Sequence, residues 1–211
     1  MHVPPLFIAG LAAEASPLVA QAWLRRRPRG ARAWILMWCA FFLAMDIVGA
    51  WFGYHGKNNL WLYYILTPVN VSLVLWALSH WQPTELWRLA YRIAVVPLLL
   101  VWGTLTWAVE NTSTFSQAAE PMAELVALAA AAFTLVVRSY GGLGDLRRQD
   151  WFWITGGMSL YFGVSAAGSP LGAALVSARP DLFALAWQIK TALGIGAFLL
   201  ITRGVLCKPV H

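Results

Sequence analysis

Seven long apolar stretches, separated by short polar segments, take up most of the chain. They cover residues 4–24, 33–53, 59–80, 89–109, 118–137, 151–176 and 182–202. An α-helix rises about 1.5 Å per residue, so each stretch is long enough to cross ~30 Å of hydrocarbon. The pattern predicts an all-α polytopic membrane protein: a single domain, residues 1–211, that forms a seven-transmembrane-helix bundle. In the sixth stretch, Gly168-Ser169-Pro170 leaves room for a break in the helix.

The composition indicates that lipid is the surrounding solvent. Of the 211 residues, 60% are hydrophobic and 11% are charged, whereas soluble domains contain about 25% charged residues. The connecting segments are too short for a soluble catalytic domain, so we expect a protein that is not an enzyme. The net charge of +6 could suggest nucleic acid. However, the basic residues flank the apolar stretches, which favours the lipid bilayer as the partner and no nucleic acid.

Positive charge predicts how the helices are oriented. Of the 15 Lys and Arg residues, 12 lie on one side of the predicted bundle. Because basic residues gather on the cytoplasmic side of membrane proteins, we expect the N-terminus outside and the C-terminus in the cytoplasm. The 12 residues are Arg25, Arg26, Arg27, Arg29, Arg32, Arg88, Arg92, Arg138, Arg147, Arg148, Arg203 and Lys208.

A lysine, Lys190, lies near the middle of the last apolar stretch. An ammonium group in hydrocarbon costs about 2.5–3.5 kcal/mol on insertion scales, so it marks a functional site that needs a partner. In the predicted orientation, the carboxyl groups of Asp46, Glu14 and Glu124 lie at a similar depth, in the outer half of the membrane. We therefore expect a polar pocket for a small apolar or anionic ligand. Its other predicted ligand-binding residues are Tyr63, Tyr64 and Trp187.

A simpler interpretation stays open at this point. Lys190 would form a buried ion pair with Asp46 or with Glu14 that only orients the helices, and Trp187 would be a packing residue. No catalytic set of serine, histidine and acid can be placed at one depth, so no catalytic residue is predicted. No metal site is expected either, because the histidines are scattered between the two membrane faces. They are His2, His55, His80 and His211.

Aromatic and polar residues are concentrated in two segments, which read NNLWLYYILTP at 58–68 and FWITGG at 152–157. Together with Tyr161-Phe162, they are similar to a family of uncharacterised bacterial seven-helix integral membrane proteins. Where that family has Trp-x-Ile-His, this chain has Trp187-Gln188-Ile189-Lys190. The resemblance spans most of the chain from residue 59 onward. It implies a multi-pass protein of the bacterial cytoplasmic (inner) membrane, but no activity.

The run Lys190-Thr191-Ala192-Leu193-Gly194, together with Thr67-Pro68, resembles microbial rhodopsins. Those proteins also have seven helices, an N-terminus outside and a lysine in the last helix that binds retinal as a Schiff base. The resemblance implies retinal as a cofactor, bound to Lys190. An amine away from water suits imine formation, because it is more readily neutral there.

Two departures from the rhodopsin pattern concern the acidic residues. Leu62 stands near the place where rhodopsins have a carboxylate counterion, and Ala186 replaces the acidic residue one turn before the lysine. Asp46 or Glu14 would have to serve as the counterion.

The leading prediction is a receptor-like, sensory membrane protein that binds a small ligand around Lys190. Its short basic cytoplasmic loops would contact a signalling partner, because nothing in the chain can signal alone. The alternatives are a retinal-binding photoreceptor or pump, a small-solute transporter, and a structural subunit of a membrane complex. Many transporters are built from internal repeats, and the sequence shows no convincing one.

Overall fold

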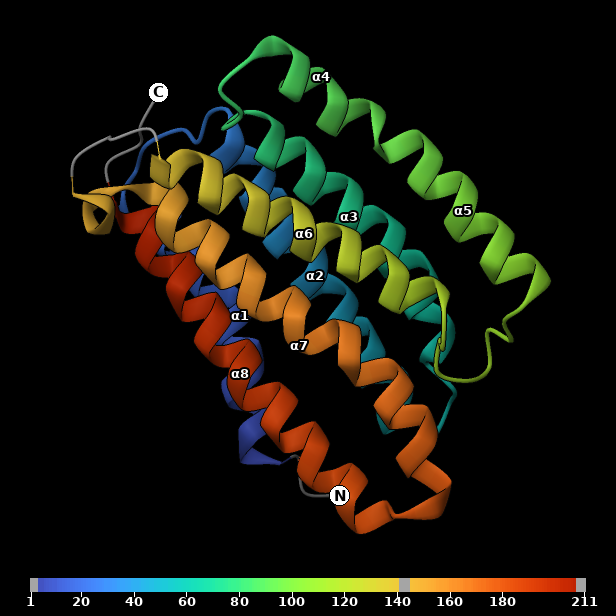
Figure 1. Cartoon of the computed structure of the whole chain (residues 1–211). Helices are drawn as coiled ribbons and strands as arrows, with labels where there is room; N and C mark the ends of the chain where they lie inside the picture. Colours follow the sequence, from blue (N-terminus) through green and yellow to red (C-terminus); the bar gives the residue numbers. More distant parts are fainter. Residues whose placement is uncertain (1–3, 141–144, 208–211) are drawn as a thin grey trace.

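The computed structural model describes residues 4–140 and 145–207, and its helices lie side by side in one bundle (Figure 1). It confirms the all-helical fold and the seven stretches that are long and apolar enough to cross a membrane. His2, Lys208 and His211 lie outside the described residues. The helices are α1 (Pro5–Trp23), α2 (Ala31–Tyr54), η1 (Leu60–Leu62), α3 (Tyr63–Ser79), α4 (Glu85–Ile93), α5 (Val95–Ala108), α6 (Ala119–Tyr140), η2 (Leu146–Arg148), α7 (Asp150–Ala178) and α8 (Pro180–Leu206).

The fourth apolar stretch begins earlier than predicted and is interrupted once. Thr84 caps the start of α4, where its hydroxyl oxygen accepts a hydrogen bond from the Trp87 amide at 3.3 Å. The helix is interrupted at Ala94 and continues as α5. Pro97 accounts for the interruption, because proline has no N–H to donate to the carbonyl of Ile93.

The helix break that Gly168-Ser169-Pro170 would allow in the sixth apolar stretch does not occur. α7 is continuous from Asp150 to Ala178, with Pro170 inside it. A proline in a membrane helix removes one backbone hydrogen bond, and packing against neighbouring helices can compensate for that loss. α7 lies between α6 and α8 and has the most extensive helix contacts in the bundle, which explains why it stays helical.

Six of the helices form a closed ring. Contacts join α1 to α2, α2 to α3, α3 to α6, α6 to α7, α7 to α8, and α8 back to α1. The contact between α1 and α8 includes a hydrogen bond of 2.6 Å between the hydroxyl groups of Ser16 and Thr202. α4 and α5 lie outside the ring, against α3 and α6 (Figure 1). The fourth apolar stretch is therefore peripheral, and the first and last helices are neighbours.

Two glycines bring α7 and α8 into close contact. A Cβ atom at Gly157 would lie 2.6 Å from the carbonyl oxygen of Ala197, and one at Gly204 would lie 2.5 Å from Cγ1 of Ile154. Small residues allow helix backbones to approach in this way, which increases van der Waals contact between membrane helices.

Five aromatic residues join α2, α7 and α8 across the interior of the ring. Trp38 is fully buried and stacks on Phe198, with a centroid distance of 5.6 Å and an interplanar angle of 10°. Tyr161 and Phe162 contact the same tryptophan, and Phe42 packs against Tyr161 and Phe198. We call these five residues the aromatic cluster.

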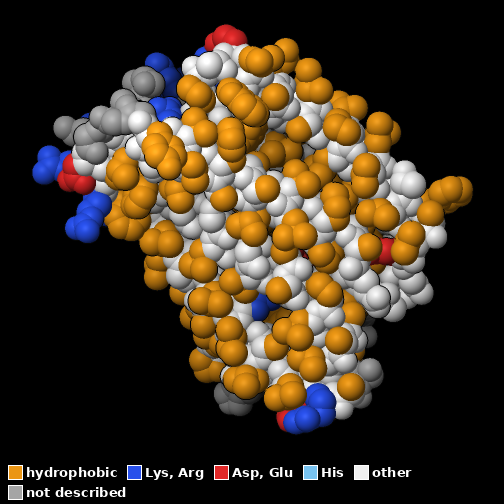
Figure 2. All heavy atoms as spheres, in the orientation of Figure 1, with side chains coloured by type: hydrophobic (Ala, Val, Ile, Leu, Met, Phe, Trp, Pro, Cys, Tyr) orange, Lys and Arg blue, Asp and Glu red, His pale blue; other side chains and the backbone are white. Residues whose placement is uncertain are grey.

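On the face that Figure 2 shows, most charged side chains lie near the two ends of the bundle and apolar side chains are spread over its sides, with a basic side chain visible in a hollow between the ends. This is the distribution expected of a bundle surrounded by lipid. We call the end where α1 finishes and α2 begins the basic end, and the opposite end, where α1 begins, the N-terminal end. At the basic end, the buried guanidinium of Arg32 donates to Oδ2 of Asp150 at 3.1 Å and to the carbonyl of Cys207 at 2.9 Å. These bonds tie α2 to α7 and to the end of α8.

Candidate functional site

The ring encloses a cavity of about 280 Å³ in the half nearer the N-terminal end. This volume is close to the lower limit of known small-molecule pockets, about 300 Å³. Among the described residues, those of α4 and α5 do not line the cavity. The walls come from residues 7–14 of α1, 42–53 of α2, 59–70 in and before α3, 120–124 of α6, 161–165 of α7 and 187–198 of α8.

Six of the seven predicted ligand-binding residues line this cavity. They are Glu14, Asp46, Tyr63, Glu124, Trp187 and Lys190.

The seventh predicted residue, Tyr64, lies elsewhere. Its hydroxyl group donates to the backbone carbonyl of Asn111 at 3.2 Å. Successive residues of a helix point about 100° apart, so of two adjacent tyrosines only Tyr63 faces the cavity.

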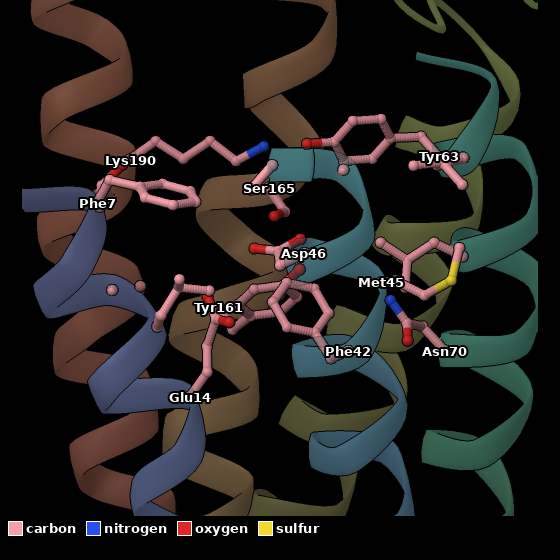
Figure 3. A pocket seen from close by; sticks show the side chains of 18 of the residues that line it. Phe7, Glu14, Phe42, Met45, Asp46, Tyr63, Asn70, Tyr161, Ser165 and Lys190 are labelled. Carbon is pink, nitrogen blue, oxygen red and sulfur yellow. The ribbon is translucent and has the colours of Figure 1, made fainter. Parts of the chain in front are cut away.

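Lys190 extends into the cavity from α8, and Tyr63 extends into it from α3 on the opposite wall (Figure 3). The ammonium nitrogen Nζ lies 4.9 Å from the ring centre of Trp187, which is a cation–π contact. The lysine side chain passes close to Gly168 of α7, where a Cβ atom would lie 2.9 Å from Nζ. Gly168 therefore leaves the space that the lysine occupies.

The direct ion pair of the simpler interpretation is not formed. The four ion pairs among the described residues do not include Lys190. Its ammonium group is instead near enough to Asp46, Glu120 and Glu124 to interact electrostatically with each of them. The ammonium group of Lys190 therefore interacts with several carboxyl groups and forms a direct ion pair with none of them.

Glu14 of α1 and Asp46 of α2 are directed toward the same part of the cavity (Figure 3), and their carboxyl groups lie within hydrogen-bonding reach of each other. An ionised carboxylate only accepts hydrogen bonds, so two ionised groups cannot bond to one another. With both ionised, the buried Oε2 of Glu14 has no donor. Oε2 of Glu124 and Oδ1 of Asn70 are also buried without a donor. The cavity thus presents several unpaired acceptor oxygens.

A further carboxyl group in the wall, that of Glu120, was not among the predicted site residues. It lies one turn before Glu124 on α6 and lines the same cavity. Its Oε2 accepts a hydrogen bond of 2.6 Å from the hydroxyl of Ser169 on α7. The spacing of four residues from Glu124 was the available signal, since such residues share a helix face. However, residues near the start of a membrane-spanning stretch often lie among the headgroups.

The aromatic cluster forms the floor of the cavity on the side of the basic end. Phe42, Tyr161 and Phe198 line the cavity, while Trp38 and Phe162 lie behind them and are almost completely buried. The cavity ends at this cluster.

Residues 109–118 join α5 to α6 at the N-terminal end of the bundle. Oε1 of Glu110 accepts hydrogen bonds from the backbone amides of Gln117, Ala118 and Ala119 at 2.7–3.0 Å. Burial alone would raise the pKa of Glu110, but the amides of Ala119 and Ala118 hold it below the usual value for glutamate. This carboxylate fixes the start of α6, and with it the position of Glu120.

Comparison with known proteins finds no matching family model, no matching curated protein and no matching solved structure. Within residues 4–140 and 145–207, the protein is a helix bundle with seven helices able to cross a membrane and a cavity lined by charged residues inside its ring. The resemblances to an uncharacterised bacterial family and to rhodopsins stay predictions.

Proposed function

We propose that this chain is a receptor-like membrane protein that binds a small molecule in the cavity around Lys190. The cavity itself is the supporting observation, because charged side chains from α1, α2, α6 and α8 converge in it inside an otherwise apolar bundle. Ionisable groups are costly within a membrane and usually mark a functional site. Their convergence on one cavity supports ligand binding over separate structural roles.

The closed floor supports a sensory role over passage of a solute. A ligand in contact with Phe42, Tyr161 and Phe198 would press on Trp38 behind them and change how α2, α7 and α8 pack. The same three helices meet again at the basic end through Arg32. A signalling partner at that end would respond to such a change.

In the proposed arrangement, the chain crosses a bacterial inner membrane with its N-terminus outside and its basic end in the cytoplasm. The positions of the arginines support this orientation, because the residues between α1 and α2 include Arg25, Arg26, Arg27 and Arg29. Lys57 and Arg179 are the basic side chains described near the other end. The cavity would then lie in the outer half of the membrane.

The test is a thermal-unfolding screen of the purified protein against small cationic, anionic and neutral molecules. A bound ligand raises the unfolding temperature, because it stabilises the native state. A compound that acts in the cavity should lose its effect in Gly49→Leu, since Gly49 lines the cavity and the larger side chain would fill it.

Gly103→Leu is the matched control. Gly103 lies in α5, outside the ring, and a Cβ atom there would have no neighbour within 4 Å. This variant should keep the response to every active compound. The proposal fails if no compound stabilises the protein, or if both variants lose the response equally.

Retinal binding is a second candidate function, favoured by the surroundings of the Lys190 amine. The amine lies in the cavity without a direct ion pair, and the aromatic rings of Trp187, Phe42 and Phe198 line the same space. A primary amine and the retinal aldehyde condense to an imine with loss of one water molecule. Asp46 would be the counterion of the protonated imine.

Addition of retinal to the purified protein should then give a visible absorption band. Reduction with borohydride should fix the retinyl group on Lys190, as a mass increase of the peptide that contains it. Lys190→Ala should lose both signals. If the wild-type protein gives no band, retinal is excluded, and the receptor proposal is unaffected.

A further inference from the structure

The cavity contains more negative than positive groups. Its walls include the carboxyl groups of Glu14, Asp46, Glu120 and Glu124, but Lys190 is the one cationic side chain among the described lining residues. Ionised carboxylates away from water are costly unless a positive charge or a proton compensates them. One ammonium group cannot compensate four ionised carboxylates, so the remaining carboxyl groups must either hold protons or be compensated by a further cation.

Three acceptor oxygens in the wall have no donor. They are Oε2 of Glu14, Oε2 of Glu124 and Oδ1 of Asn70. Their residues are only 8%, 6% and 5% exposed, and all three line the cavity. Figure 3 shows Glu14 and Asn70 directed into it. A buried acceptor without a donor costs about 1–3 kcal/mol, so these atoms indicate a ligand that donates hydrogen bonds.

A metal ion does not fit this arrangement. Within residues 4–140 and 145–207, no group of three His, Cys, Asp or Glu side chains is close enough together to hold one. The carboxyl groups come from three different helices around the cavity, which suits a larger cation. Water could donate to the unpaired oxygens, but unlike an organic cation it brings no charge to compensate carboxylates that are ionised.

Aromatic and apolar side chains make up the rest of the wall. Phe42, Tyr161 and Phe198 form the floor, and Phe7 lies on the opposite side, near Lys190 (Figure 3). Aromatic ring faces attract cations and also pack well against a hydrocarbon group. The floor therefore suits the apolar part of a ligand whose charged group lies among the carboxylates.

We propose that the ligand of this pocket is a small organic amine, whose ammonium group lies among Glu14, Asp46 and Glu124 and whose apolar part packs on the aromatic floor. This inference rests on the proposed function and specifies its ligand class. It reverses the expectation of an apolar or anionic ligand, which followed from Lys190 alone. In the structure, Lys190 is already surrounded by carboxyl groups and is not the dominant charge.

The test compares three probes of similar size and shape: 2-phenylethylamine, 2-phenylethanol and phenylacetate, which are cationic, neutral and anionic. Each is titrated into the purified full-length protein, and its dissociation constant is obtained from the shift in unfolding temperature. We expect 2-phenylethylamine to raise the unfolding temperature at concentrations where the other two have no effect.

The variant that tests the charge is Asp46→Asn, with Glu124→Gln as a second one. Each removes a negative charge and keeps the size of the side chain, so both proteins should fold. Loss of one partner of a buried charge pair should weaken 2-phenylethylamine binding roughly 30-fold or more. Glu85→Gln is the matched control. The Glu85 side chain is 85% exposed at the basic end, so its loss should leave binding unchanged.

Lys190→Met separates this inference from any proposal that depends on the lysine. It removes a positive charge from the site, so amine binding should be stronger, whereas retinal or an anion would no longer bind. The inference is overturned if phenylacetate or 2-phenylethanol stabilises the protein better than the amine. In that case the receptor function still holds with another ligand class. If none of the three probes acts, the inference is also overturned, and the wider screen then decides the receptor function.

Discussion

At the scale of single residues, one carboxylate oxygen determines where α6 begins. Oε1 of Glu110 accepts three backbone amide bonds and one from the hydroxyl of Ser116, so it acts as an N-cap from outside the helix. These bonds hold the pKa of Glu110 below the usual value although burial alone would raise it. The folded state therefore favours the ionised form.

The sign of the pH dependence follows from this lowered pKa. The contribution of Glu110 to stability should be fully present above the unfolded-state pKa of about 4.3, and it should be lost as the pH falls through the lower folded-state pKa. Glu110→Gln should cost about 0.5–1 kcal/mol at neutral pH, as for other caps. The difference in unfolding temperature between the two proteins should shrink in acid. A difference that stays constant with pH would contradict this role.

Prediction of which residues share a cavity succeeded where a side chain was rare in its surroundings. Lys190, Asp46 and Glu14 stand out in apolar stretches, and the structure brings them to one cavity. It failed where two positions looked alike, as for Tyr63 and Tyr64. Apolar residues surround both positions of that helix, so the sequence carries no periodic signal for the inward face. The direction of each tyrosine depends on contacts with residues far away in sequence.

At the scale of helices, the contact between α7 and α8 allows a sharp comparison of two adjacent glycines. A Cβ atom at Gly157 would meet the backbone of α8 at Ala197, whereas one at Gly156 would have no neighbour within 4 Å. Gly157→Ala should therefore separate the helices and lower the free energy of unfolding by about 1–3 kcal/mol. Gly156→Ala should be neutral or slightly stabilising, because alanine favours helix more than glycine does.

This comparison can be measured by thermal unfolding in the same detergent. Equal behaviour of the two variants would mean that α7 and α8 are not in contact at Gly157.

The helices themselves were largely predictable, because a membrane requires about 20 apolar residues for each crossing. The effect of two prolines on the helices was not predictable. Pro97 interrupts its helix whereas Pro170 does not, although each lies in an apolar stretch. α5 lies outside the ring, whereas α7 lies between two neighbours. Packing can therefore compensate for the missing hydrogen bond in α7 more than in α5. Sequence alone does not show which helices become neighbours.

At the scale of the whole molecule, the orientation in the membrane can be tested by cysteine labelling in intact cells. In a chain whose native Cys39 and Cys207 are replaced by serine, Ser113→Cys should react with a membrane-impermeant maleimide added outside. Arg27→Cys should react only after the cells are opened, because positive charge favours the cytoplasmic side. The reverse pattern would invert the topology and place the cavity in the inner half of the membrane.

The meeting of α1 and α8 in the ring has a consequence for biosynthesis. Glu14 leaves the ribosome 176 residues before Lys190. No nascent chain can hold a finished pocket until α8 has been synthesised and has joined α1. A ligand could therefore rescue a mutant only after α8 has been synthesised, and premature stop codons before α8 should yield proteins that never respond to the ligand.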